Sequence, residues 1–241
     1  ALSNHQGNLA AGSTKRGIAP VYADKAYRHG IRMVDLLEPD IFKEKIKKAY
    51  EFNAALIKSL KGKIPEESLE SIFQNYVYHG KRLSKYICDT EHELSKAYAE
   101  GKRILFEGAQ GMSLDLDHGL YPHNTSSNNV AGYAEVGSGL AINNKSTRIG
   151  VMKAYVSRVG ESPFPTELSG PLGQELRERG KEYGTTTGRA RRVGWLDLVQ
   201  VRQSVRLSGL NALAITKLDI LGGLNKIKIC VAYRAGSKSI Q

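Results

Sequence analysis

Apolar residues recur at helical spacing over the first hundred positions of the chain. One apolar face is formed by Ile41, Phe42, Ile46, Ala49, Tyr50 and Ile57, with Asn53 at the same spacing. Asp40 is a suitable N-cap, and Gly62 and Pro65 are typical of a helix end. We therefore predict a helix from Asp40 to about Leu60.

A second helical stretch follows between residues 66 and 99. Its apolar stripe consists of Leu69, Ile72, Phe73, Tyr76, Leu83 and Ile87. Gly80 lies inside the stripe and is expected to split it. Residues 1–35 are rich in glycine and polar side chains, and the stretch "DKAYRHGIRMVDLL" (24–37) predicts a short helix or turn.

After residue 100 the pattern shortens to that of strands. We predict strands at 103–108, 149–159, 212–221 and 226–233, and a helix over 195–210 that ends near Gly209. Strands that alternate with helices indicate an α/β fold with a mostly parallel central sheet and flanking helices. We expect one α/β domain over 1–241, itself part of a larger domain, with a helical subregion at about 36–100.

Ligands of parallel sheets bind beyond the carboxyl ends of the strands. A long polar segment, residues 108–140, follows the first predicted strand, and "KLD" (217–219) comes after residues 212–216 of the third. These segments are therefore the first places to look for a site.

Composition narrows the class of ligand. The net charge is +11 and the chain has two cysteines, Cys88 and Cys230, which we expect to be reduced core residues in a cytosolic protein. There is no signal-peptide pattern at the start and no apolar run of membrane length. The arginines cluster beside glycine and threonine instead of spreading along an aromatic-rich face, which favours a pocket for small phosphates over nucleic acid.

Four short motifs carry candidate chemistry. "TTTGRARR" (185–192) can bind carboxylates or phosphates or be a basic surface loop, and "TKLD" (216–219) resembles a guanine-reading motif or a capped helix start. "DLDH" (115–118) is either a metal or acid–base cluster or a loop ordered by Asp115 and Asp117. "GNLAAGST" (7–14) has the glycine spacing of a phosphate loop but lacks its lysine.

Together these segments resemble the adenylosuccinate synthetase family. The matching words are "RGIAPVYADKAYRHGIRMVDL" (16–36), "FEGAQGMSLDLDHGLYPHNTSSN" (106–128), "SRVGESPFPTEL" (157–168), "TTTGRARRVGWLDLV" (185–199), "TKLDIL" (216–221) and "CVAYR" (230–234). The resemblance implies a P-loop-NTPase-like α/β fold. It also implies a GTP-dependent ligation of L-aspartate to IMP through 6-phosphoryl-IMP, with Mg²⁺ as cofactor, in a cytoplasmic homodimer of purine biosynthesis.

The resemblance also implies roles for individual residues. The IMP-binding set would be Thr14, Arg28, Gln110, Thr125, Val159 and Arg189, with Gln110 supporting catalysis near O6 and Arg28 reaching across the homodimer. The aspartate-binding set would be Thr185, Thr186, Thr187, Gly188, Arg189 and Arg191. The GTP-binding set would be Arg191, Lys217, Leu218 and Asp219.

The chain departs from the family pattern in ways that limit this carry-over. The family's "GDEGKGK" segment, which supplies the catalytic aspartate and metal contacts, and its catalytic histidine are not matched, nor is its carboxyl-terminal part. We therefore expect a central piece with doubtful activity alone and Mg²⁺ ligands outside it. Lys15 and Ala190 stand where the family has glycine and arginine. Alternatives are a variant for another purine monophosphate and a non-catalytic, basic nucleic-acid-binding relative.

Overall fold

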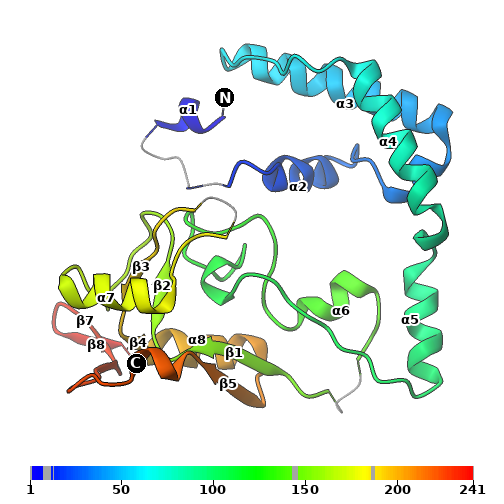
Figure 1. Ribbon diagram of the computed structural model, residues 1–241. Coiled ribbons are helices and arrows are strands. Elements are labelled where there is room, and N and C mark those ends of the chain that lie inside the picture. The colour runs from blue at the N-terminus through cyan, green and yellow to red at the C-terminus, as the bar shows by residue number, and fades with distance from the viewer. Residues whose placement is uncertain (1, 8–11, 13, 143–145, 186–187, 241) are drawn as a thin grey trace. The chain divides into compact units, whose positions relative to one another are not determined.

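The computed structural model describes residues 2–7, 12, 14–142, 146–185 and 188–240 (Figure 1). Contacts divide the chain into two compact units. Unit 1 comprises residues 1–11 and 15–104, and unit 2 comprises residues 12–14 and 105–241. The expectation of a single domain over 1–241 stays a prediction.

Unit 1 is helical. Its helices are α1 (Leu2–Gln6), α2 (Ile18–Tyr27), the 3₁₀ helix η2 (Met33–Leu37), α3 (Pro39–Ser59), α4 (Leu69–Leu83), the 3₁₀ helix η3 (Ser84–Tyr86) and α5 (Thr90–Ala99). The helix predicted at 40–60 is therefore confirmed as α3. Its N-cap is Glu38 and not Asp40, because Pro39, which lacks an N–H, takes the first helical position.

The core of unit 1 lies between η2, α3 and α4. Phe42, Ile46 and Phe73 are buried with Leu36, and the rings of Phe42 and Phe73 stack with centroids 5.6 Å apart. These residues come from the apolar stripes of the two predicted helices. The apolar stripes are thus the faces that the two helices bury against each other.

Gly80 does not split the second helical stretch, and that prediction was wrong. It lies inside α4, where an added Cβ would come within 2.7 Å of the Leu36 carbonyl oxygen. The break falls instead at residues 84–89, before Asp89 caps α5 by accepting from the His92 N–H at 3.1 Å. The glycine is explained by close packing of α4 on η2.

Unit 2 mixes strands and helices. Its strands are β1 (Ile149–Lys153), β2 (Val156–Arg158), β3 (Arg192–Gly194), β4 (Leu196–Asp197), β5 (Ala212–Thr216), β6 (Ile229–Cys230), β7 (Tyr233–Ala235) and β8 (Lys238–Ile240). Its helices are η4 (Met112–Leu114), α6 (Tyr133–Ser138), α7 (Pro171–Gly180), α8 (Leu198–Ser208) and η5 (Leu218–Leu221). The predicted helix at 195–210 is α8, and Gly209 ends it with φ 58°.

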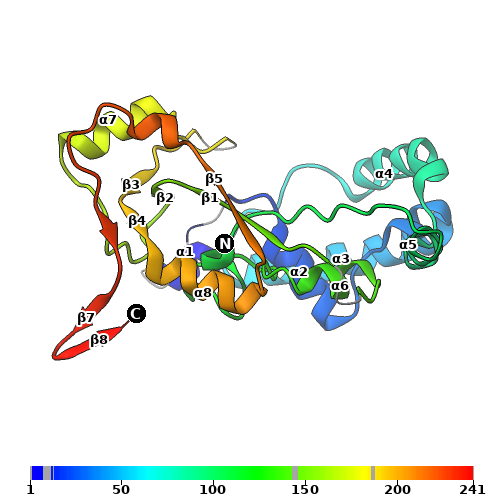
Figure 2. The same cartoon turned by 90° about the horizontal axis from the view of Figure 1, so that it is seen from below.

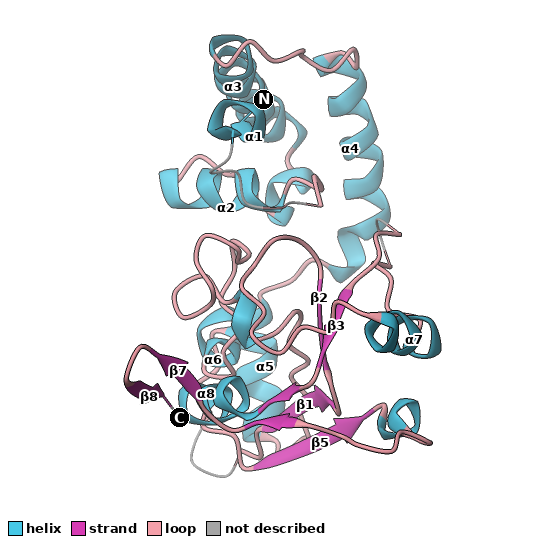
Figure 3. Cartoon of the chain, turned by 90° about the vertical axis from the view of Figure 1, so that its left-hand side faces the viewer, coloured by secondary structure: helices cyan, strands magenta, loops and turns pink. Residues whose placement is uncertain are grey.

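The described strands form four pairs, of which β1–β5, β2–β3 and β7–β8 are labelled in Figure 3. β1 runs parallel to β5 with Lys153 opposite Thr216, and β4 runs parallel to β6. β2–β3 and β7–β8 are antiparallel, and the β7–β8 hairpin is seen at the C-terminal end in Figure 2. The combination of helices with parallel strand pairs confirms the α/β class.

All four strand predictions need correction, and the one at 212–221 is a strand only to Thr216, because Leu218–Leu221 form the 3₁₀ helix η5. Residues 103–108 form no strand, and Leu105 is 90% exposed, because no described segment pairs with this stretch. The stretch 149–159 is two strands, separated at the buried residues Ala154 and Tyr155. Of 226–233, the pairing with β4 covers only β6, whereas Tyr233 begins β7.

The core of unit 2 is centred on the packing of α7 against β3 and η5. Ala154, Tyr155, Leu176, Val193 and Leu221 are its buried members. Cys88 is exposed and Cys230 is half-buried, so the expectation that both cysteines are core residues was wrong. Among the described helices, none combines the length and the apolar character needed to cross a lipid bilayer.

Candidate functional site

A buried carboxylate gathers three cationic side chains in unit 2. Glu182 is fully buried and accepts from Lys153 Nζ at 2.7 and 2.8 Å and from Arg191 Nη1 at 2.8 Å. Tyr155 Oη donates to the same carboxylate at 2.6 Å. Lys217 Nζ lies 3.9 Å from it. We call Glu182, Lys153, Tyr155, Arg191 and Lys217 the Glu182 cluster.

The charge state of Glu182 follows from these contacts. Burial alone would raise its pKa, but the hydrogen bonds from Lys153, Tyr155 and Arg191 outweigh burial and lower the pKa to about 2. The carboxyl is therefore ionised at neutral pH. Burial and the bond to Glu182 together raise the pKa of Tyr155, so its hydroxyl stays a neutral donor.

The loop predicted to bind aspartate begins and ends at this cluster. The Arg191 N–H donates to the Glu182 carbonyl at 2.9 Å, and Tyr183 bridges Ala190 in antiparallel fashion. Gly184 N–H donates to the Arg189 carbonyl at 2.8 Å, and Gly188 takes φ 64°. The described residues on the two sides of this segment are thus paired with each other. Thr186 and Thr187 lie outside the described residues.

The segment predicted to read guanine lies at the carboxyl end of β5. Lys217 follows Thr216 and donates to the Gly180 carbonyl at 2.5 Å, at the end of α7. Leu218 and Asp219 lie in η5, and Leu218 is 62% exposed. Because β1 and β5 are parallel neighbours, their carboxyl ends bring Lys153 and Lys217 to the same carboxylate.

Three predicted site residues adopt the left-handed backbone conformation without being glycine. They are Arg28 (φ 66°), Gln110 (φ 62°) and Lys217 (φ 59°). Such conformations are uncommon for residues with a Cβ and cluster at binding and catalytic sites. Lys15, Lys61 and Lys181 share this conformation, and Arg28 adopts it as the C-cap of α2, so the backbone alone does not single out these positions.

The polar segment 111–130 is ordered by Asp115. Its side chain is fully buried, and it accepts from the backbone N–H groups of Asp117 and His118 at 3.0 Å, of Val130 at 3.1 Å and of Asn129. Burial would raise the pKa of Asp115, but these donors outweigh it and lower the pKa. Of the two interpretations of "DLDH", the loop-ordering one fits these contacts.

The other predicted residues lie in separate parts of the chain. Thr125 N–H donates to the Leu114 carbonyl at 2.9 Å inside the Asp115-ordered loop, and Val159 is 41% exposed directly after β2. Thr14 belongs to unit 2 and is exposed, whereas Arg28 ends α2 in unit 1. Most of "GNLAAGST" lies outside the described residues. The structure thus brings together Arg191 and Lys217, and the full set stays a prediction.

A second network, partly buried and centred on the buried Asp197, joins α8 to the segments around it. Asp197 caps α8 and accepts from Gln200 Nε2 at 2.8 Å and from the Tyr233 hydroxyl. Gln200 Oε1 accepts from Ser113 at 3.0 Å and from Arg158. Burial and the bond to Asp197 raise the pKa of Tyr233 to about 12. This network holds the side chain of Arg158, the residue before Val159.

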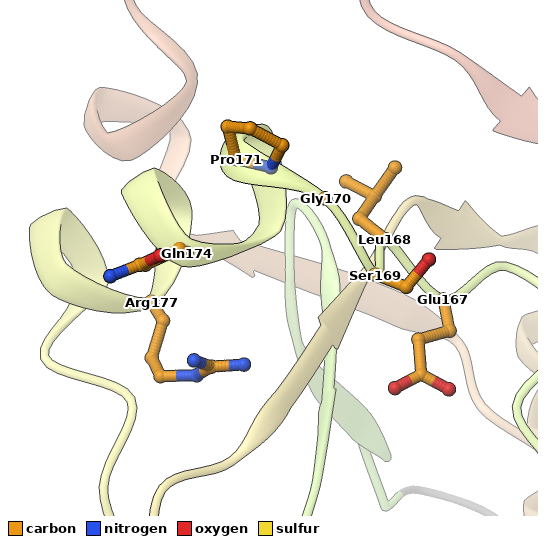
Figure 4. A pocket seen from close by; sticks show the side chains of 7 residues that line it. All are labelled: Glu167, Leu168, Ser169, Gly170, Pro171, Gln174 and Arg177. Atoms are coloured by element: carbon orange, nitrogen blue, oxygen red, sulfur yellow. The ribbon is translucent and has the colours of Figure 1, made fainter.

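A cavity of about 480 Å³ lies at the start of α7 (Figure 4). It is lined by Glu167, Leu168, Ser169, Gly170, Pro171, Gln174 and Arg177. None of these is a predicted site residue. Glu167 forms an ion pair with Arg192, and Arg177 donates to the Arg191 carbonyl at 2.7 Å. Both charged groups of the lining are therefore bonded within the protein. The cavity is therefore not assigned to a ligand.

Sequence reasoning missed Glu182, Lys153 and Tyr155. An isolated glutamate in "KEYG" and a lysine inside a strand carry no recognisable spacing. The only available signal was position, because Lys153 stands at the carboxyl end of a predicted parallel strand.

No group of three or more histidine, cysteine, aspartate or glutamate side chains among the described residues could hold a metal ion. Asp115, the best acidic candidate of the sequence, already accepts four backbone N–H groups. The described residues therefore do not fit a Mg²⁺ site.

The fold and this site define an α/β protein with cationic groups at the carboxyl ends of parallel strands. The family model of adenylosuccinate synthetases matches residues 1–241. The chain belongs to the adenylosuccinate synthetase family.

Relatives support this assignment. The chain is 50% identical over 230 residues to the adenylosuccinate synthetase of Thermodesulfovibrio yellowstonii, covering 95% of this chain and 54% of that protein. It is 50% identical over 236 residues to that of Caldanaerobacter subterraneus subsp. tengcongensis, covering 98% and 55%. The chain thus spans about half the length of the curated relatives it matches.

A solved structure agrees. The fully ligated adenylosuccinate synthetase from Plasmodium falciparum superimposes with a TM-score of 0.87 at 38% identity, covering 92% of this chain and 51% of that one. The α/β fold of this family is therefore the fold of this chain.

Proposed function

We propose that this chain is part of an enzyme that uses GTP to join L-aspartate to IMP, giving adenylosuccinate, GDP and phosphate. The family membership supports the reaction class. The observation that carries the proposal for this chain is the shared buried carboxylate of Glu182, which holds Arg191 of the proposed aspartate loop and approaches Lys217 of the proposed guanine segment.

The proposed chemistry has two steps. In the first, IMP loses its N1 proton to a base, and its O6 attacks the γ-phosphorus of GTP while the bond to GDP breaks. In the second, the amine of aspartate attacks C6 and loses a proton, while the bond from C6 to O6 breaks and phosphate leaves. The first step converts O6 from a poor leaving group into phosphate, and the reaction needs three anionic substrates held together.

The residues of this chain would act by binding and orienting. Arg189 and Arg191 would hold aspartate carboxylates through bidentate hydrogen bonds, and Arg189 would also touch IMP. The other aspartate-binding residues of the loop would be Thr185, Thr186, Thr187 and Gly188. Lys217 and Leu218 would lie against the guanine ring, while Asp219 accepts from its N1–H and 2-amino groups.

The IMP side of the proposal uses residues of unit 2 and one residue of a second copy of the chain. Thr14 and Thr125 would contact its phosphate, Gln110 would donate near O6, and Val159 would line the ribose. Arg28 would reach the phosphate of IMP in a second copy, which makes a homodimer part of the proposal. Mg²⁺ and a cytoplasmic setting, consistent with the free Cys88 and Cys230, complete it.

The test is a reaction assay. The chain is completed at both ends to the length of its relatives and incubated with IMP, GTP, aspartate and Mg²⁺. We expect adenylosuccinate and GDP in equal amounts. No product, with an established family member active in parallel, would refute the proposal. Product only with another purine monophosphate would establish the substrate variant.

The nucleic-acid alternative has a different signature. A basic nucleic-acid-binding protein would bind oligonucleotides with an affinity that falls steeply with salt, and would respond little to IMP. Protection by IMP without oligonucleotide affinity would exclude it.

A further inference from the structure

The Glu182 cluster carries an excess of positive charge. One buried carboxylate faces three cationic groups, whose side chains remain partly exposed: 28% for Lys153, 28% for Arg191 and 38% for Lys217. Glu182 itself is 1% exposed as a side chain. A ligand cannot reach the carboxylate, but it can reach the cations that the carboxylate gathers.

The backbone around Glu182 is fixed on both sides. Its N–H donates to the Arg177 carbonyl, and its carbonyl accepts from Arg191, both at 2.9 Å. Gly180, two residues before it, has no room for a side chain, since a Cβ there would lie 2.3 Å from the Tyr155 hydroxyl oxygen. The position of the Glu182 carboxylate is therefore set by the backbone around it and does not depend on a bound substrate.

Glu182 links segments that the proposed function gives to different substrates. Arg191 closes the proposed aspartate loop, and Lys217 begins the proposed guanine segment. Lys217 is also tied by its donation to the Gly180 carbonyl. Both cations are thus oriented by the short stretch 180–182.

We propose that Glu182 is a positioning residue that orients both Arg191 and Lys217. The cation of the aspartate loop and the cation of the guanine segment are then held in place by the same carboxylate. This inference rests on the proposed function, which gives Arg191 and Lys217 to different substrates and places Glu182 in contact with neither substrate. Without the charge of Glu182, three like charges would repel one another, and Arg191 would lose its fixed direction. The affinities for aspartate and GTP would then fall together.

The experiment uses the completed enzyme with Glu182→Gln, which keeps the shape and removes the charge. We expect KM for aspartate and KM for GTP each to rise about tenfold, with KM for IMP changed less than about threefold, in the usual range of coupling between sites. Glu182→Asp keeps the charge on a side chain that is one methylene shorter. This variant should fold and should raise KM for aspartate and KM for GTP to a smaller extent.

Two control variants separate positioning from general damage. Glu178→Gln makes the same chemical change at an exposed carboxylate on α7, and Leu172→Ala weakens the packing of α7 in the core. Neither should raise the aspartate and GTP constants together, whatever its melting temperature.

The outcomes distinguish this inference from the proposed function. An unsubstituted enzyme that makes no adenylosuccinate refutes the proposed function. An active enzyme refutes the inference alone if Glu182→Asp leaves both constants unchanged, if only one of them rises, or if Leu172→Ala reproduces the pattern.

Discussion

At the scale of single residues, two buried carboxylates have different tasks. Asp115 accepts only backbone N–H groups and orders a loop, whereas Glu182 accepts from Lys153 and Arg191, which face solvent in part. A carboxylate bonded to the backbone stabilises a conformation. A carboxylate bonded to cationic side chains also determines where those charges point.

The first prediction concerns Asp115→Asn. The amide keeps one acceptor oxygen and places an N–H₂ group against backbone donors, so the free energy of unfolding should fall by about 1.5–3 kcal/mol. Urea denaturation measures this. Asp117→Asn is the matched control, since Asp117 accepts from Asn128 at 2.5 Å at an exposed position and should cost much less. Equal losses in the two variants would contradict the role of Asp115.

The second prediction is that Asp115 makes the stability of the protein depend on pH. Its pKa is lowered in the folded protein, so its stabilisation is complete above the unfolded value of about 3.9 and is lost as the pH falls through the folded pKa. The Asp115→Asn protein should therefore lose less stability than the parent between neutral pH and acid. Parallel curves for parent and variant would show that Asp115 does not contribute.

A third prediction tests the proposed reading of guanine by Asp219. In Asp219→Asn one acceptor becomes a donor, which opposes the guanine N1–H and 2-amino donors, so the preference for GTP over ATP in kcat/KM should fall by about tenfold or more. KM for IMP should stay unchanged. Asp40→Asn, at an exposed position in α3, is the control for charge. A retained GTP preference would remove Asp219 from the guanine site.

At the scale of elements, the close approach of α4 to η2 depends on Gly80. An alanine Cβ would lie 2.7 Å from the Leu36 carbonyl oxygen and 2.9 Å from the Leu36 Cβ, so α4 would have to move. Gly80→Ala should therefore destabilise unit 1 by about 1–3 kcal/mol, despite the higher helix propensity of alanine. Thermal denaturation of the variant measures this loss.

Gly30→Ala is the control for that change, since its Cβ would meet only ordinary contacts of 3.5 Å or more. If Gly80→Ala were as stable as the parent, the helices would be packed less closely than described, and the glycine would be incidental.

At the scale of the whole molecule, the proposed homodimer makes a quantitative prediction. Arg28→Leu and Arg191→Leu should each inactivate the completed enzyme, because each removes a cation that we propose binds a substrate anion. If Arg28 acts across the interface, a mixed dimer has one site with both arginines and one with neither. Random mixing gives half mixed dimers, so about a quarter of the parental activity should return.

Subunit exchange is measured by assaying the mixture over time. Activity that stays at the level of the separate variants would place Arg28 and Arg191 in the same subunit or outside the site. A variant mixed with itself under the same conditions is the control for recovery through refolding.

Much of the local structure followed from the sequence because it depends on neighbours along the chain. The apolar stripe at 41–57 is sufficient for α3, and the glycine at 209 is sufficient to end α8. The ordered family words likewise identified the candidate site residues, since each word is a local pattern. These features need no knowledge of what packs against them.

Other features depended on contacts between distant segments. A run such as 103–108 is a strand only if another segment pairs with it, and none of the described residues does so. Gly80 can be read as a helix breaker until Leu36 is seen against it. For Gly80, the deciding partner lies many residues away along the chain.

The sequence by itself therefore determined the α/β class, the family and the cationic loops, because those depend on composition and local order. Only the tertiary structure decided that Lys153, Arg191 and Lys217 meet at Glu182, which is 29 residues from Lys153. The physical reason is that burial of a charge is stable only where opposite charges and donors surround it. That surrounding forms when the parallel strands β1 and β5 and the end of α7 come together.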